Sequence, residues 1–162
     1  MRPQDYARVW PKHLPTSLTV PQTSVWYNLE VSARRYPGKA AVIFYGSRLS
    51  YADLARDAGR LAGFLRQRCG IARGDRVLLS AQNSPQFIVA YYATLRCNAV
   101  IVPVGPMNVT AEIAHYVRDS GARTAIVAQE LFQQYQPLLR KVSDVSDTCD
   151  NCLTHVIVGA VR

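Results

Sequence analysis

Residues 74–103 have the sequence GDRVLLSAQNSPQFIVAYYATLRCNAVIVP, and this stretch decides the order of the fold. It contains two short apolar runs, at residues 77–79 and 100–102, which we expect to be buried strands. Between them, Ser84 precedes Pro85 in a pattern typical of a helix start, because proline at the first helical position loses no hydrogen bond. Strand, helix and strand in this order predict a parallel pair joined by a right-handed crossover.

The alternation of strand and helix continues on both sides of this unit. We expect the helix that follows Ser84 to turn Phe87, Ile88, Tyr91 and Leu95 inward, because these residues recur at helical spacing. Ser50 and Asp53 have the spacing of a capping box and predict a helix that begins at Ser50 or Tyr51. The other expected elements are a helix after Ser24, a buried strand at 40–44, a tight turn at 45–48 that brings Leu49 back beside this strand as a short hairpin arm, a helix stop at Gly70, a helix capped by Asn108 or Thr110 and stopped at Gly121, a strand at 125–127, a helix at 131–139 and a strand at 156–158.

The predicted fold class is therefore α/β, with a mostly parallel sheet flanked by helices. Residues 1–23 contain Pro3, Pro11, Pro15 and Pro21 and have no sustained periodicity. We expect them to form an extended amino-terminal arm, and residues 24–162 to form the α/β domain.

Composition narrows the function classes. The chain has 162 residues, a formal net charge of +8 and 49% hydrophobic residues, which is typical of a globular domain. Its arginines are spread through helices and turns instead of forming a patch, so we interpret them as a solvated surface and expect no nucleic-acid partner. No apolar run has the length of a signal peptide or a membrane span, which predicts a cytoplasmic, soluble chain with no transmembrane segment. All four cysteines are then expected to stay reduced.

A search for chemistry finds little. The glycines at 70 and 74 do not belong to a phosphate-binding loop, because lysine and a hydroxyl residue are missing from the pattern. Cys149 and Cys152 have the spacing of half a zinc site, yet no second pair completes it, and nearby His155 offers only a third ligand. Glu112 and His115 share a helix face without a further ligand, and His13 has no identifiable partner. We therefore predict no catalytic, cofactor-binding or metal-binding residue.

Four segments together resemble the motifs of adenylate-forming enzymes. LSYADL at 49–54 is similar to the first core motif, L-T/S-Y-x-E/D-L, and LRCNAVIVP at 95–103 is similar to the second, L-K/R-x-G-A-x-x-V-P. GDRV at 74–77 and NSPQF at 83–87 resemble the family's G-D-R-V strand entry and N-S-x-E-F helix start, in the same order. Asn98 departs from the pattern, because the family usually has glycine there.

The resemblance runs from about residue 20 to 128, with weaker support to 159, and is greatest to bacterial long-chain fatty acid–CoA ligases. It implies the amino-terminal subdomain of the adenylate-forming enzyme fold. It also implies a parent enzyme that uses ATP, Mg²⁺ and coenzyme A. In that reaction a carboxylate attacks the α-phosphate of MgATP to give an acyl-adenylate and pyrophosphate, and the thiol of coenzyme A then displaces AMP.

The family's phosphate loop, its ATP-contacting motifs and the lysine of its carboxy-terminal domain have no matching positions in residues 1–162. We therefore expect a scaffold fragment that is not catalytic alone, binds none of these cofactors, and has as its partner the remainder of the ligase downstream of Arg162. Two other interpretations stay open: a free-standing module of the same fold that binds a nucleotide, an acyl chain or a sister subunit, and an anion-binding surface protein. If the parent sheet continues past Val158, an uncovered strand edge predicts self-association into a homo-oligomer.

Overall fold

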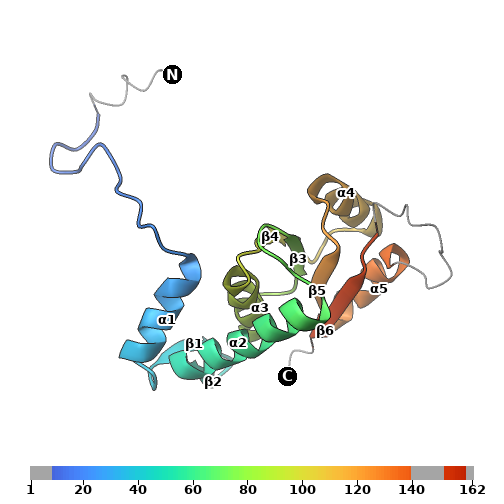
Figure 1. Cartoon of the computed structure of the whole chain (residues 1–162), viewed down its shortest axis with the longest axis horizontal. Coiled ribbons are helices and arrows are strands. Elements are labelled where there is room, and N and C mark those ends of the chain that lie inside the picture. Colours follow the sequence, from blue (N-terminus) through green and yellow to red (C-terminus); the bar gives the residue numbers. More distant parts are fainter. Residues whose placement is uncertain (1–8, 140–151, 160–162) are drawn as a thin grey trace.

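The computed structural model describes residues 9–139 and 152–159 and shows a parallel sheet between helices, with a separate hairpin beside it (Figure 1). Residues 9–24 form turns and coil and extend away from the body before the first helix begins. The elements, in chain order, are α1 Val25–Arg35, β1 Ala40–Phe44, β2 Ser47–Ser50, α2 Tyr51–Arg68, β3 Arg76–Ser80, α3 Pro85–Arg96, β4 Val100–Pro103, α4 Thr110–Ser120, β5 Thr124–Ala128, η2 Gln129–Leu131, α5 Phe132–Tyr135, η3 Gln136–Leu138 and β6 His155–Gly159.

The main sheet has four strands in the order β4-β3-β5-β6, all parallel. The predicted α/β class with a mostly parallel sheet is thus confirmed. Consecutive strands β4 and β5 are not neighbours, because the chain returns over the sheet through α4 to pair β5 with the other edge of β3. No helix within the two described ranges is both long and apolar enough to cross a bilayer.

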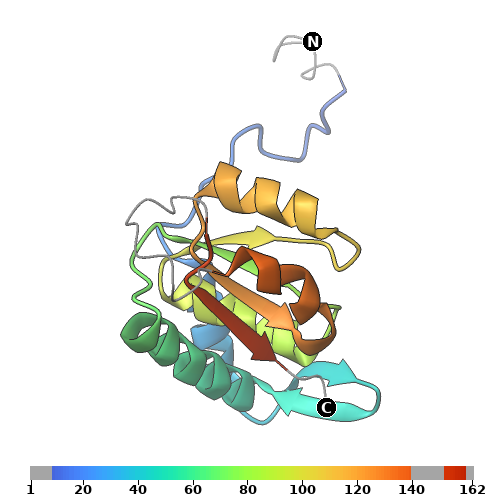
Figure 2. The ribbon, with the colours of Figure 1, turned by 90° about the vertical axis from the view of Figure 1, so that its right-hand side faces the viewer.

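The two faces of the sheet carry separate hydrophobic cores. Val77 and Leu79 of β3 pack with α2 and α3 on one face, and Leu78 packs with α4 and α5 on the other. Figure 2 shows β5 and β6 lying between the two helical layers. Successive side chains of a strand point to opposite faces, so a continuous apolar run such as that of β3 is what a sheet covered on both sides requires.

The hairpin of β1 and β2 is confirmed, but the predicted burial of its first strand is wrong. β1 occupies residues 40–44 as expected, yet Ile43 exposes 66% of its surface. Among the described residues β1 pairs only with β2, antiparallel, across the turn at Tyr45 and Gly46, whose φ angles are 45° and 81°. An apolar run predicts a strand well, yet it does not show whether both faces of that strand are covered.

The predicted caps of two helices are confirmed. The Ser50 hydroxyl accepts a hydrogen bond from the backbone N–H of Asp53 at 3.1 Å, and α2 begins at Tyr51. The Ser84 hydroxyl accepts from the backbone N–H of Phe87 at 3.2 Å, with Pro85 at the first helical position. These bonds satisfy N–H groups that a helix start otherwise leaves without partners.

The remaining helix ends follow the predictions in part. Gly70 and Gly121 both have the left-handed conformation of a helix stop, with φ of 66° and 65°. Ser24 stands at the amino-terminal cap of α1, but its side chain makes no capping bond. The cap of α4 is neither Asn108 nor Thr110 but Val109, whose backbone N–H donates to the Glu112 carboxylate at 3.0 Å.

The face that α3 turns toward the core was predicted only in part. Its buried residues are Ala90, Ala93 and Thr94. Phe87 is half-buried and packs against this core as predicted, whereas Tyr91 exposes 37% of its surface. Small side chains let α3 approach α2 closely, and the Cys97 thiol, just past α3, lies 3.5 Å from the carbonyl oxygen of Ala62 on α2.

Candidate functional site

In a parallel sheet, the carboxyl ends of the central strands are where a ligand-binding site is expected. From β3 the chain passes through α3 to β4 on one side, and it returns through α4 to β5 on the other. Ligands of open α/β sheets bind at such a reversal, in the crevice outside the carboxyl ends of the strands. Here β3 ends at Ser80, β5 at Ala128 and β6 at Gly159.

An apolar groove of about 390 Å³ opens beside these ends, between α2, α3 and the last strand. The Gln86 side chain lies at this groove, and its Oε1 is buried with no hydrogen-bond partner among the described residues. A buried amide oxygen without a partner costs free energy, so the groove is completed when a further group donates to it. The lining residues are Leu49, Asp57, Leu61, Pro85, Gln86, Val89, Ala90, Ile126, Ile157 and Gly159.

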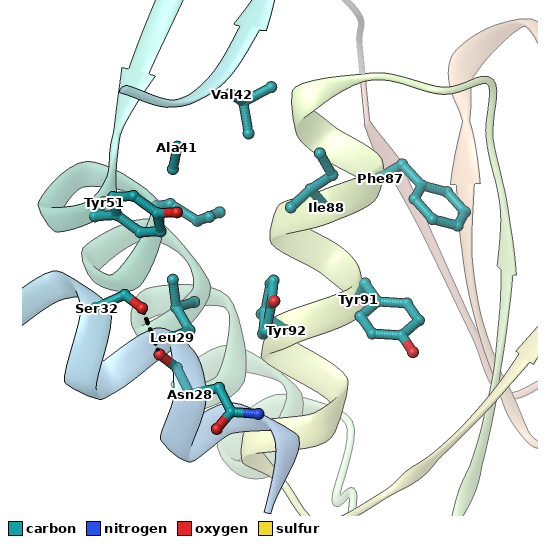
Figure 3. A pocket seen from close by; sticks show the side chains of 11 residues that line it. Asn28, Leu29, Ser32, Ala41, Val42, Tyr51, Phe87, Ile88, Tyr91 and Tyr92 are labelled. Atoms are coloured by element: carbon teal, nitrogen blue, oxygen red, sulfur yellow. Dashed lines mark hydrogen bonds between the residues drawn. The ribbon is translucent and has the colours of Figure 1, made fainter. Parts of the chain in front are cut away.

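A second pocket, of about 490 Å³, lies between α1, the hairpin, the start of α2 and α3 (Figure 3). Bulky α3 side chains line it: the Phe87 and Tyr91 rings stack with centroids 6.3 Å apart, and Tyr91 meets Tyr92 edge-on at 5.9 Å. At the α1 side, the Ser32 hydroxyl donates to the backbone carbonyl of Asn28 at 2.8 Å. The pocket has apolar walls and no carboxylate, histidine or cysteine among its lining residues, so its arrangement suits binding and not proton transfer.

The sequence motifs are brought together as structural supports. The backbone N–H of Gly74 donates to the carbonyl of Asn98 at 2.9 Å, and that of Val100 donates to the carbonyl of Asp75 at 2.7 Å. These two bonds join the segment at 74–77 to the segment at 95–103, where β3 and β4 begin. Asn98 has φ 56°, which explains why a glycine is typical here and why asparagine, which tolerates this conformation, can replace it.

The thiols show no sign of activation. Burial raises the pKa of Cys97 and of Cys69, and both are free. The expectation that all cysteines stay reduced is wrong for Cys152, which is disulfide-bonded. Spacing in the sequence does not show whether the backbone brings two thiols to the distance and angle that a disulfide requires. Cys149 lies outside the described residues.

In the candidate metal pair of Glu112 and His115, the carboxylate of Glu112 already has a structural role. The Glu112 carboxylate accepts hydrogen bonds from the Asn108 side chain at 2.9 Å and from the backbone N–H of Val109, and these bonds lower its pKa. His115 is exposed on the same helix, and His13 is exposed in the arm. Within residues 9–139 and 152–159, no three His, Cys, Asp or Glu side chains gather as the ligands of an all-protein metal site would.

Comparison with known proteins identifies the family pattern. The sequence pattern of the AMP-binding enzyme family matches residues 29–159. The chain is 34% identical over 123 residues to a long-chain fatty acid–CoA ligase of Bacillus subtilis, a match that covers 76% of the chain and 22% of that protein. It is 39% identical over 136 residues to a salicyl-AMP ligase / salicyl-S-ArCP synthetase of Mycobacterium tuberculosis, covering 80% of the chain and 23% of that protein. The chain thus spans less than a quarter of the length of either relative.

Solved structures show the same fold. The crystal structure of a long-chain-fatty-acid-CoA ligase from Archaeoglobus fulgidus superposes with a TM-score of 0.74 at 23% identity, over 88% of this chain and 28% of that one. At this identity the likeness establishes the fold alone.

Proposed function

The chain belongs to the family of AMP-binding enzymes, and on that premise we propose that it forms the amino-terminal scaffold of a long-chain fatty acid–CoA ligase. The observation that carries this proposal is the use of the motif residues. The hydroxyls of Ser50 and Ser84 cap helices, and Gly74 and Asn98 bond to each other through their backbones. These bonds give the motif residues a role in supporting the fold.

In this proposal the whole enzyme converts ATP, a fatty acid and coenzyme A into acyl-CoA, AMP and pyrophosphate. Because the described residues contain no set of metal ligands, we assign no step of that reaction to them. The nucleotide, Mg²⁺ and coenzyme A would be held by parts of the enzyme beyond these residues. The scaffold contributes by fixing the sheet on which those parts assemble.

The partner of this scaffold is then the remainder of the ligase, and the groove beside β6 is where we place it. β6 is an edge strand of the described sheet, and Val158 on it exposes 44% of its surface. An edge strand next to an apolar groove is a surface that proteins normally cover. The buried Oε1 of Gln86 would gain its missing donor from the same contact.

The acyl-chain class is the finest part of the proposal. The similarity to the ligase of Bacillus subtilis supports a long-chain acid. The chain is also similar to part of a salicyl-AMP ligase, whose name refers to an aromatic acid. A scaffold that carries no substrate contact is expected to occur with both.

The experiment exchanges the matching region of the Bacillus subtilis ligase for residues 24–159 of this chain and measures acyl-CoA formation from a long-chain fatty acid and from salicylate. We expect the chimera to form long-chain acyl-CoA. The separate 162-residue chain should release no pyrophosphate from ATP with either acid. Pyrophosphate release by the separate chain, at a rate proportional to its concentration, would refute the scaffold assignment.

Two variants of the chimera test the docking surface. Val158→Asp places a charge on the edge strand and is expected to abolish activity, because a buried unpaired carboxylate is costly. Ile43→Asp is the matched control, since Ile43 is a more exposed aliphatic residue, on the separate hairpin. Equal activity of the two variants would show that the remainder of the enzyme does not cover β6.

A further inference from the structure

A polar cleft of about 520 Å³ lies at the end of the sheet opposite to the groove. Arg76, Thr124 and His155 line it, and they are the first residues of β3, β5 and β6. The groove, by contrast, lies at the carboxyl ends of these strands. The complete lining is Cys69, Gly70, Ile71, Asp75, Arg76, Gly121, Arg123, Thr124, Thr154 and His155.

Arg76 is held rigidly in the wall of this cleft. Its Nε donates to the carbonyl oxygen of Ser120 at 2.6 Å, and its Nη1 donates to that of Gly74 at 3.2 Å. These bonds offset the negative end of α4, which is a sufficient structural reason for the arginine. Nη2 lies against Gly121, where an added Cβ would be only 2.9 Å away. The Nη2 group of Arg76 can still donate hydrogen bonds to a ligand.

Arg123 is different, because its guanidinium makes no hydrogen bond or ion pair among the described residues. Only its backbone is engaged: the carbonyl accepts from the N–H of Thr154 at 2.8 Å, from the Thr154 hydroxyl at 3.0 Å and from the N–H of His155 at 3.2 Å. The backbone of Arg123 is thus fixed where β5 begins, while its side chain stays available.

His155 lines the cleft next to Arg123 and Thr154. Its Nδ1 lies 3.1 Å from the Thr154 hydroxyl, whose proton is directed to the Arg123 carbonyl. Nδ1 is then the donor of this pair. The one acidic lining residue, Asp75, already accepts from the backbone N–H of Ala72 at 2.8 Å.

We propose that this cleft binds a small molecule through its phosphate group, with Arg123 as the main ligand and Arg76 as a supporting donor. A guanidinium presents paired N–H donors that match a phosphate in a bidentate way. The cleft has the size of an ordinary small-molecule site and exceeds what a bare phosphate fills. The site is separate from the groove and from the acyl-transfer function proposed above.

The test is a calorimetric titration of the 162-residue chain with inorganic phosphate and, in a second arm, with glycerol phosphate, both at constant ionic strength. We expect saturable binding of each anion. Arg123→Gln should weaken both about tenfold or more, because a hydrogen bond to a charged group is lost. Tighter binding of glycerol phosphate identifies an organic phosphate as the ligand, and equal binding identifies the phosphate group alone.

Arg60→Gln is the matched control, because Arg60 is likewise exposed but lies on α2 away from the cleft lining. It should leave both affinities unchanged. Equal weakening by Arg60→Gln and Arg123→Gln, or binding that never saturates, would overturn the proposal. Should Arg123→Gln fail to fold, modification of the wild-type chain by phenylglyoxal gives the answer: phosphate should protect Arg123 and not Arg60, and equal protection would equally refute the site.

Discussion

Replacing Ala93 with leucine tests the packing of α3 directly. Ala93 is fully buried and faces α2, in a cluster with Ala58, Ala62 and Ala90. The helices meet closely there, since the Cys97 thiol reaches a backbone carbonyl of α2. An isobutyl group has no room at this contact. We therefore expect Ala93→Leu to lower the free energy of unfolding by about 1–3 kcal/mol, as overpacked cores do.

The assay is urea denaturation followed by far-UV circular dichroism, and Tyr91→Ala is its companion. Tyr91 exposes 37% of its surface, so its truncation should cost well below the roughly 3–5 kcal/mol of a fully buried aromatic residue. If α3 turned Tyr91 inward, as the sequence pattern predicted, Tyr91→Ala would lower the free energy of unfolding more than Ala93→Leu. Ala93→Leu within about 0.5 kcal/mol of the wild type, together with a large loss for Tyr91→Ala, would refute the orientation described above.

Two further predictions concern the motif residues. Asn98→Ala should lower the free energy of unfolding by about 1 kcal/mol, because φ at this position is 56° and alanine tolerates the left-handed region poorly; a urea midpoint unchanged from the wild type would contradict this. Hydrogen bonds from Ser50 and Arg56 hold the pKa of Asp53 below its ordinary value of 3.8. Its contribution to stability is therefore fully present above that value and is lost as the pH falls through the folded-state pKa, so thermal melts of Asp53→Asn should depend less on pH between about 5 and 2 than those of the wild type.

The fold was predictable where local chemistry decides it. A serine before a proline specifies a helix start whatever surrounds it, and Ser84 and Pro85 form one. A run of Val and Leu indicates a strand, and β3 is one. Such signals are properties of neighbouring residues, so they survive without knowledge of the tertiary structure.

The buried face of α3 and the cleft at Arg123 were less predictable, because both depend on contacts between residues far apart in the sequence. The small residues of α3 that pack on α2 lie next to a stripe of bulky residues, and helical spacing alone favours the bulky stripe. Arg123 and His155 meet because β5 and β6 pair with Thr124 opposite His155. No spacing within the sequence indicates that register, so the cationic cleft was not predicted.

The position of β3 also has a consequence for how the protein is synthesised. β3 and β4 are joined by α3 and can pair as soon as both have left the ribosome, but the other edge of β3 is filled only by β5, which is made later. Until then this nascent intermediate presents an unpaired, apolar strand to its surroundings. We expect the stretch between β4 and β5 to be the interval in which chaperones bind the growing chain, and in which a stalled ribosome exposes its product to aggregation.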